Sequence, residues 1–275
     1  MDAIAKLRWA SRKLRLGLRR EDLVLDIGCG NAPNPRADVT CDMLSNNSER
    51  SADLRTDRPF VWARAERLPF KNDAFDFVIL PHVLEHTFQP EQLLAEIQRV
   101  ARRGYIETPA AWQEFLLPYT YHVSRVALNS GVLQIRIKNK WDDAVDRYAP
   151  EIRERLYEVY RQTVKRNPEL CMTQYFWNRP IRFEVKRDEQ PGEWDKLPND
   201  PSNAQTPSKI YRLAVRVIES AVRRRRNVEL LQLLACPECH HDLKVEGPEA
   251  ATVFCSECCR RYVKFRGYYN FLQAG

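Results

Sequence analysis

The 275-residue sequence has no apolar run of about 20 residues, the length that a helix needs to cross a bilayer. It also lacks a charged segment followed by a short apolar segment of the kind that directs secretion. The eight cysteines are too few and too unevenly placed for a disulfide scaffold, because five of them lie within residues 236–259. We therefore expect a protein of a reducing compartment, the cytoplasm, without a membrane partner.

Basic residues are concentrated in two segments, although the net charge of the whole chain is only +7. Residues 1–20 carry seven basic residues against one acidic residue, and residues 209–226 carry seven more against one. We predict a basic helix in each segment. Such faces can bind phosphate groups or anionic surfaces, or they can simply be solvated. The acid-poor start of the chain is also typical of transit peptides.

Short apolar runs alternate with helical patterns through the first 167 residues. The runs lie at residues 22–27, 39–43, 60–62, 75–80 and 104–108, and the helical patterns at 3–16, 90–102 and 151–167. This alternation predicts an α/β fold with a parallel sheet whose faces are covered. Two further runs, 172–177 and 181–186, have the pattern of a half-exposed hairpin. Residues 188–208 are rich in Pro, Asp, Asn and Ser, which predicts a linker.

A glycine turn follows the first predicted strand. Gly28 and Gly30 allow a sharp turn and the close approach of a ligand to the backbone. Pro33 stands where a dinucleotide-binding loop needs a third glycine, and the Gly-Lys-Ser/Thr of a P-loop is absent. Asp42 ends the second strand, where a carboxylate can accept from both ribose hydroxyls. An acid for ribose without a phosphate cradle suits S-adenosylmethionine as the cofactor.

Residues 22–108 resemble the class I S-adenosylmethionine-dependent methyltransferases, in the subgroup with a Val-Leu-Glu-His signature. The matching stretches are residues 23–30, 41–42, 65–70, 75–78 and 82–86. The resemblance implies a Rossmann-like sheet of seven strands, within a methyltransferase domain that we place at residues 1–187. It also implies these contacts: Asp26, Gly28 and Gly30 around the methionine part, Asp42 on the ribose, Ala65 and Glu66 at the adenine, and His82 beside the cofactor.

Three features depart from related methyltransferases. Ala32 replaces the usual third glycine and is small enough to fit. Arg64 replaces the acid before the Ala-Glu pair, so the adenine amine must be recognised differently. The Asn-Pro-Pro-Tyr-like motif of base-methylating members is absent, since residues 80–83 read Leu-Pro-His-Val. Methylation of exocyclic amines and of glutamine is thereby disfavoured.

Several residues near the predicted strand ends can carry or orient a proton, which is a role in the methylation of a hydroxyl or carboxylate. The candidate catalytic residues are His82, Glu85, His86, Glu107 and His122. A surface position for His86 and a helix-dipole role for Glu85 are the alternatives. Residues 104–122 resemble bacterial methyltransferases of sugars and secondary metabolites. This implies an acceptor pocket with an aromatic wall, or an aromatic lid, from Trp112, Phe115, Tyr119 and Tyr121.

The first hypothesis for function is O- or N-methylation of a small-molecule or sugar-like acceptor. The second makes RNA the substrate, because the Val-Leu-Glu-His region and the basic segments resemble the wobble-uridine carboxymethyl-ester methyltransferase. A third is a non-catalytic, cofactor-binding zinc adaptor. Salt dependence separates the second from the first, since RNA binding weakens steeply as salt rises.

Two Cys-x-x-Cys pairs near the end of the chain have the spacing of a four-thiolate zinc site. The expected ligands are Cys236, Cys239, Cys255 and Cys258. Such a site has no open position for water, so we predict a structural Zn²⁺ ion. Cys259, His240 or His241 could replace one thiolate. The surrounding sequence resembles the zinc-ribbon activator of tRNA, rRNA and release-factor methyltransferases. A ribbon domain at residues 209–275 would then pack on the catalytic domain, in cis or in a dimer.

Overall fold

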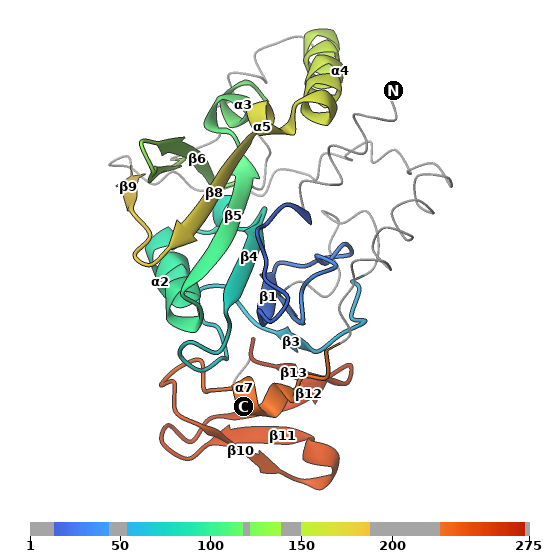
Figure 1. Ribbon diagram of the computed structural model, residues 1–275, viewed down its shortest axis with the longest axis vertical. Coiled ribbons are helices and arrows are strands. Elements are labelled where there is room, and N and C mark those ends of the chain that lie inside the picture. Colours follow the sequence, from blue (N-terminus) through green and yellow to red (C-terminus); the bar gives the residue numbers. More distant parts are fainter. Residues whose placement is uncertain (1–13, 44–53, 118–121, 139–149, 188–225, 273–275) are drawn as a thin grey trace.

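The computed structural model describes residues 14–43, 54–117, 122–138, 150–187 and 226–272, and its ribbon is shown in Figure 1. Most of the predicted N-terminal helix, the whole predicted linker and all but the last residue of the basic segment 209–226 lie outside these residues. Among the described residues, no helix combines the length and apolarity that a bilayer-crossing helix needs.

A twisted sheet with parallel central strands forms the centre of the molecule. Its order is β3 (Phe60–Trp62), β2 (Val39–Asp42), β1 (Val24–Ile27), β4 (Phe77–Pro81) and β5 (Arg103–Pro109), all parallel. Strand β8 (Met172–Asn178) is antiparallel to β5. The short apolar runs of the sequence are these strands because both faces are buried, so nearly every position must be apolar. The expected α/β class is confirmed.

Helix α2 (Pro90–Val100) covers one face of the sheet. Proline occupies its first turn, where a missing N–H group does no harm. Leu93, Leu94, Ile97 and Val100 are buried at helical spacing against the strands. The remaining helices are short or peripheral: η2 (Leu84–His86), α3 (Ala111–Leu116), α4 (Pro150–Arg166), α5 (Pro168–Cys171), α7 (Leu230–Leu233) and η3 (Pro248–Ala250).

The predicted hairpin of residues 172–186 is wrong. Strand β8 pairs with β5, whereas β9 (Phe183–Arg187) pairs in parallel with β7 (Val132–Ile137) of a second sheet. Strand β6 (Ser124–Asn129) completes this three-stranded sheet. Alternating apolar residues define the two faces of a strand but not its partner, so two strands close in sequence can join different sheets.

The C-terminal segment continues the main sheet beyond β3. Strand β13 (Tyr268–Asn270) pairs in parallel with β3 and is followed by β12 (Arg261–Phe265), β11 (Thr252–Cys255) and β10 (Leu243–Glu246). Residues 24–178 therefore supply six of the seven strands that the resemblance implies. In the described part of the chain, the position next to β3 at this edge of the sheet is occupied by β13. Figure 1 shows this C-terminal module beneath the sheet.

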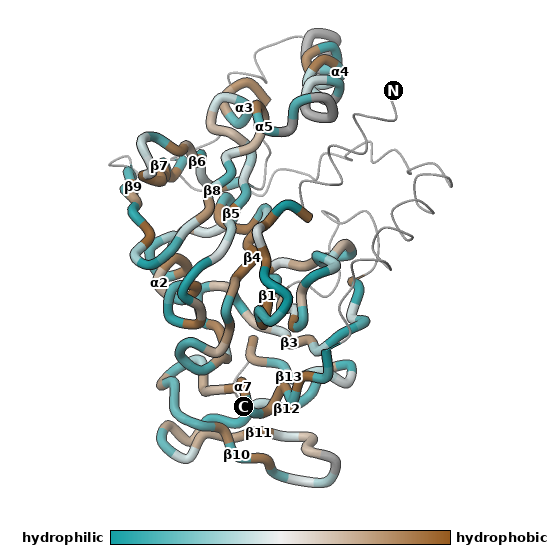
Figure 2. Tube along the Cα trace, viewed as in Figure 1, coloured by the Kyte–Doolittle hydropathy of each residue, from teal (hydrophilic) through white to brown (hydrophobic). Residues whose placement is uncertain are grey.

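The module and the sheet share one hydrophobic core. Leu234, Tyr269 and Phe271 are buried in the same cluster as Val61 and Phe70. Figure 2 shows brown, hydrophobic positions both along central strands such as β4 and in the C-terminal module near β12 and β13. Backbone hydrogen bonds join the two parts, from Phe271 N to Trp62 O at 2.8 Å and from Lys71 N to Leu233 O at 2.9 Å. The C-terminal module thus packs in cis on the edge of the sheet.

Candidate functional site

The glycine turn lies at the carboxyl ends of β1 and β2, where ligands of α/β sheets bind. Gly28 and Gly30 have φ values of +70° and +53°, which side chains other than glycine rarely adopt. The Asp42 carboxylate accepts from the Gly30 N–H at 2.9 Å, and the Asp26 carboxylate accepts from the Asn34 N–H at 2.6 Å. The structure therefore brings Asp26 of β1 and Asp42 of β2 together around the turn that contains Gly28 and Gly30.

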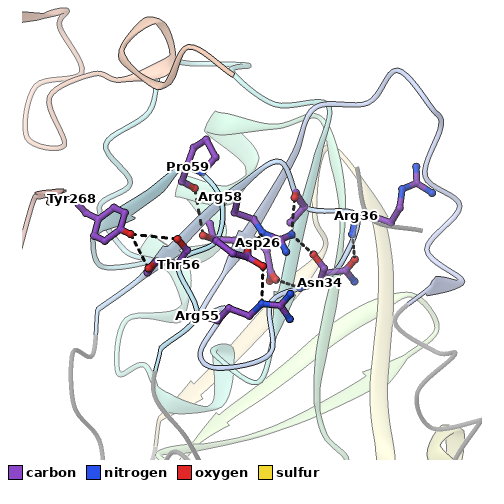
Figure 3. A network of polar contacts seen from close by, with 11 residues as sticks. Asp26, Asn34, Arg36, Arg55, Thr56, Arg58, Pro59 and Tyr268 are labelled. Carbon is purple, nitrogen blue, oxygen red and sulfur yellow. Dashed lines mark hydrogen bonds and ion pairs between the residues drawn. The ribbon is translucent and has the colours of Figure 1, made fainter. Parts of the chain in front are cut away.

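No helix follows this turn before β2; residues 28–38 make only bends and turns. Contacts from a neighbouring loop hold residues 28–38 in place of a helix, as Figure 3 shows. Arg58 donates to the carbonyl oxygens of Asn34 at 2.6 Å and Ala37 at 2.8 Å. The Arg55 N–H donates to the Gly30 carbonyl at 3.2 Å. The shape of the turn therefore depends on the loop between β2 and β3.

The C-terminal module reaches the same loop. The Tyr268 hydroxyl donates to Thr56 Oγ1 at 2.8 Å and stacks edge-on against Phe60. Thr56 lies between Arg55 and Arg58, the two residues that contact the glycine turn. A continuous set of contacts thus runs from the module to the predicted cofactor turn.

The glycine turn also contacts the Val-Leu-Glu-His segment. A Cβ atom on Gly28 would lie 2.3 Å from Val83 Cγ2, so only glycine fits here. Nearby, Glu66 accepts a hydrogen bond from the Thr87 hydroxyl, and Ala65 is buried. The predicted adenine residues therefore lie beside the segment that contains His82 and His86.

His82 follows β4 and lies between two buried carboxylates. Its Nδ1 is 3.2 Å from Glu85 Oε1, and its Nε2 is 3.5 Å from Glu107 Oε1. Burial opposes the charge of the ring, but hydrogen bonding to Glu107 and Glu85 outweighs it and raises the pKa of His82 to about 9. His82 is therefore a cation near neutral pH, and it donates hydrogen bonds instead of accepting a proton.

Glu107 is buried at the end of β5 and has several partners. It accepts from the Tyr105 hydroxyl at 2.5 Å and from Gln174 Nε2 at 3.0 Å. Gln174 comes from the antiparallel strand β8, directly opposite Glu107. These bonds fix the carboxylate that faces His82.

Glu85, His86 and His122 form a second group. Their ligand atoms lie within 4.8 Å of one another, and the two imidazole rings meet edge to face with centroids 4.7 Å apart. Burial favours the neutral carboxyl of Glu85, yet hydrogen bonding to His82 and nearby histidines lower its pKa. One carboxylate and two imidazoles are a donor set that could hold a divalent metal ion. All five predicted catalytic residues thus lie in one region, with His82 linking Glu107 to this group.

Sequence reasoning missed the partners of His122. Glu114, on α3, accepts from His122 Nδ1 at 2.5 Å and from Lys138 Nζ at 2.9 Å, and all three side chains are buried. Burial would raise the pKa of Glu114, but His122 and Lys138 lower it below its ordinary value. An ionised Glu114 can only accept, so His122 carries its proton on Nδ1 and can take another on Nε2.

The predicted aromatic wall is placed differently. Trp112 and Phe115 are 45% and 54% exposed, and they line a pocket on the outer side of α3, away from the acid–base residues. Tyr119 and Tyr121 lie outside the described residues. Helix α3 turns Gln113 and Glu114 inward, so Trp112 and Phe115 lie on its exposed side, and their role in an acceptor pocket stays a prediction.

The four predicted metal ligands come together in the C-terminal module. The sulfur atoms of Cys236, Cys239, Cys255 and Cys258 lie within 4.8 Å of one another. Cys236 Sγ is 3.5 Å from Cys258 Sγ, and Cys239 Sγ is 3.3 Å from Cys255 Sγ. Cys259 is exposed, and His240 lies against Glu96 of α2 at 3.7 Å. Neither belongs to the group.

Comparison with known proteins identifies the central part of the chain. Residues 25–106 match the methyltransferase-domain family Methyltransf_11. Malonyl-[acyl-carrier protein] O-methyltransferase of Marinomonas sp. (strain MWYL1) is 31% identical over 102 residues, which are 32% of this chain. The match spans 37% of the length of that curated relative.

The comparison with solved structures found chains that are distant in sequence. YcgJ of Bacillus subtilis is 20% identical over 38% of this chain and 50% of its own, with a TM-score of 0.30. A chain from the complex between the Haloferax volcanii Trm112 methyltransferase activator and a methyltransferase is 19% identical, with a TM-score of 0.33. That match covers 57% of this chain and 84% of the other. By the family and curated matches, the region from Leu25 to Ile106 is a methyltransferase domain.

Proposed function

We propose that the chain transfers a methyl group from S-adenosylmethionine to a small molecule. The contact between Gly28 and Val83 carries this proposal, because it joins the glycine turn to the cluster of acid–base residues. A cofactor held in the turn would therefore lie beside groups that can bind and deprotonate an acceptor. The matched methyltransferase domain covers the glycine turn and residues 82–86 of the cluster, and it ends just before Glu107.

The residues present suit this cofactor. A Cβ atom on Gly30 would meet nothing within 4 Å, so the turn is open on that side. Asp26, Gly28 and Gly30 would surround the methionine part, and Asp42 would accept from the ribose. Ala65 and Glu66 would flank the adenine, with His82 close to the cofactor. When bound, the sulfonium supplies an electrophilic methyl group for an in-line displacement.

The chain itself must align the acceptor and take up its proton. We assign the proton to His122 Nε2, since Glu114 holds the ring with Nδ1 protonated. Glu114 also stabilises the imidazolium that forms, as a carboxylate does behind a histidine base. His82, as a cation between Glu85 and Glu107, would donate to an acceptor oxygen, and His86 would contact the acceptor next to His122.

A base of this kind favours a hydroxyl or carboxyl acceptor over a neutral amine, which needs no strong base. O-methylation agrees with the curated relative, itself an O-methyltransferase. We therefore place O-methylation of a small or sugar-like molecule first and N-methylation second.

The test is incubation of the full chain with methyl-labelled cofactor and fractionated cell extract, with and without ribonuclease. Label in a small-molecule fraction supports the proposal. Label that ribonuclease removes would assign the activity to RNA instead. Calorimetry with S-adenosylhomocysteine is run in parallel, and absence of binding would leave no basis for methyl transfer. Binding without any labelled product would indicate the non-catalytic adaptor.

For the C-terminal module we propose a structural Zn²⁺ ion held by four thiolates. Tetrahedral bonds of about 2.3 Å place sulfur atoms roughly 3.8 Å apart, close to the separations of the two cysteine pairs. Four thiolates occupy all four coordination positions of the ion, which leaves none for water or substrate. The ion would therefore stabilise the module and take no part in catalysis. The module would then act as a built-in activator that holds the β2–β3 loop through Tyr268.

A further inference from the structure

A pocket of about 410 Å³ lies between α3 and the exposed face of the sheet β6–β7–β9. Helix α3 contributes Trp112 and Phe115, and the sheet contributes side chains from all three of its strands. Its volume is in the range of small-molecule sites and suits a molecule of nucleotide size. In Figure 1, α3 lies above β6 and β9, at the end of the molecule opposite the cysteine module.

Three cations stand in one row across this sheet. Arg125 of β6 is paired in register with Arg136 of β7, and Arg136 is paired with Lys186 of β9. Directly opposed residues on neighbouring strands point to the same face, and all three line the pocket. We call Arg125, Arg136 and Lys186 the cation row. The acid of the pocket wall, Glu184, lies one row away, opposite Gln134.

Like charges that face each other across strands destabilise a sheet. The cation row places three like charges side by side on the wall of one pocket, which favours an anionic ligand there. Neighbouring strands lie about 4.8 Å apart, so the row extends over roughly 10 Å. That length suits a diphosphate better than a single phosphate. Arginine at two of the three positions adds planar donor groups that match phosphate oxygens.

The aromatic side of the pocket offers surfaces for a planar ring. The Trp112 indole donates to the Leu170 carbonyl at 2.8 Å, which fixes its orientation while 45% of the side chain stays exposed. Phe115 is 54% exposed, and the Arg125 guanidinium lies over its ring at 5.4 Å. Arg125 thus joins the aromatic side to the cation row. Exposed aromatic rings beside cations are the combination that binds bases and their phosphates.

We propose that this pocket binds a nucleoside diphosphate group, with the phosphates on the cation row and the base against Trp112 and Phe115. The ligand could be a free nucleotide or a larger molecule that carries this group as a handle. The site is separate from the glycine turn, so this proposal does not depend on methyl transfer.

The probe is UDP, which lacks the adenosine of the predicted cofactor, titrated into the full chain by calorimetry. We expect saturable binding that is tighter than that of inorganic phosphate, because the base adds contacts. Arg136→Gln should weaken UDP binding roughly tenfold, as the loss of one charge-assisted contact does. Far-UV circular dichroism should show that this variant is folded, so that the lost affinity is assigned to the pocket.

Arg102→Gln is the matched control, since Arg102 is also an exposed arginine but pairs with Asp73 elsewhere. It should bind UDP like the wild type. Trp112→Leu should weaken UDP binding but leave phosphate binding unchanged. The proposal is overturned if UDP does not bind, or if Arg136→Gln and Arg102→Gln bind UDP equally well. It is also overturned if a uridine hexanucleotide binds far more tightly than UDP with steep salt dependence, which would assign the pocket to an RNA strand.

Discussion

His82 and Glu107 contact each other twice across the ends of neighbouring strands. The His82 N–H donates to the Glu107 carbonyl at 2.7 Å, and the His82 ring lies 3.5 Å from the Glu107 carboxylate. The backbone of His82 is left-handed, with a φ of +54°. This conformation ends β4 and turns the ring toward β5. Two buried carboxylates and one charged imidazole are thereby held at the carboxyl edge of the sheet.

We predict that His82→Asn weakens the pH dependence of the free energy of unfolding between pH 6.5 and 9. The unfolded histidine loses its proton near its ordinary pKa of about 6.5, whereas His82 keeps its proton to a pKa of about 9. The stabilisation is therefore complete below pH 6.5 and is lost as the pH rises through 9. Asparagine tolerates the left-handed backbone but carries no charge. Urea midpoints at pH 6, 7.5 and 9.5 measure the difference.

His240→Asn is the matched control, because His240 also has a left-handed backbone, with a φ of +61°. Partial burial and the nearby Arg99 lower the pKa of His240, so its contribution is lost as the pH falls. His240→Asn should therefore show the same loss of stability between pH 6.5 and 9 as the wild type. Parallel curves for the wild type and His82→Asn over that interval would contradict the assigned charge.

Gly28→Ala should lower stability by more than glycine replacement at another left-handed position. Gly247→Ala, with a φ of +81° and nothing within 4 Å of its Cβ, should cost about 1 kcal/mol from backbone strain alone. At Gly28 the added Cβ also meets Val83, and overpacking of this kind costs about 1–3 kcal/mol more. The double variant Gly28→Ala/Val83→Ala removes the clashing methyl groups. Denaturant unfolding should show that it recovers part of the loss, and strictly additive losses would mean that the contact is unimportant.

Five central strands could be predicted because strands buried on both faces are continuous apolar runs. Their observed ends differ from the predicted ends by at most two residues. Strands β6 and β7 were missed, although Ser130-Gly131 between them has two positive φ values, as a tight hairpin turn requires. The pairing of β8 and β9 was wrong because partner choice depends on distant residues. The pattern of apolar residues within a strand does not show which sheet edge that strand joins.

The candidate site was partly visible in the sequence. His82, Glu85 and His86 follow one strand, and Glu107 ends the next, so sheet topology predicts that they meet. Glu114 and Lys138 were not visible, because a charged residue is usually exposed and only the fold places these two in the interior. Their partner His122 was selected by residue type, and its geometry required the structure.

Glu114→Gln should destabilise the protein by about 3–5 kcal/mol, as removal of one partner from a buried charge pair does. Lys138 would keep its charge with 5% of its side chain exposed, and glutamine cannot neutralise it. The double variant Glu114→Gln/Lys138→Met should recover much of this stability but not the methyl transfer, since His122 loses its orienting carboxylate. Thermal unfolding and single-turnover rates separate the two effects. Full activity in a folded double variant would remove Glu114 from the proposed mechanism.

Removal of the metal should unfold the C-terminal module and weaken the cofactor turn. Cys236→Ser/Cys255→Ser deletes one thiolate from each predicted pair, so bound zinc should fall from one equivalent to near none. The melting temperature should drop by roughly 10 °C, because the ion supplies folding energy to a module with a small core. Cys259→Ser is the matched control, since Cys259 is exposed and adjacent to Cys258.

Elemental analysis and calorimetry would show whether affinity for S-adenosylhomocysteine falls along with the zinc content. A zinc-free double variant with unchanged stability would show that no structural ion is needed. If zinc is lost and stability drops while cofactor affinity is retained, the contact from Tyr268 to Thr56 does not support the glycine turn.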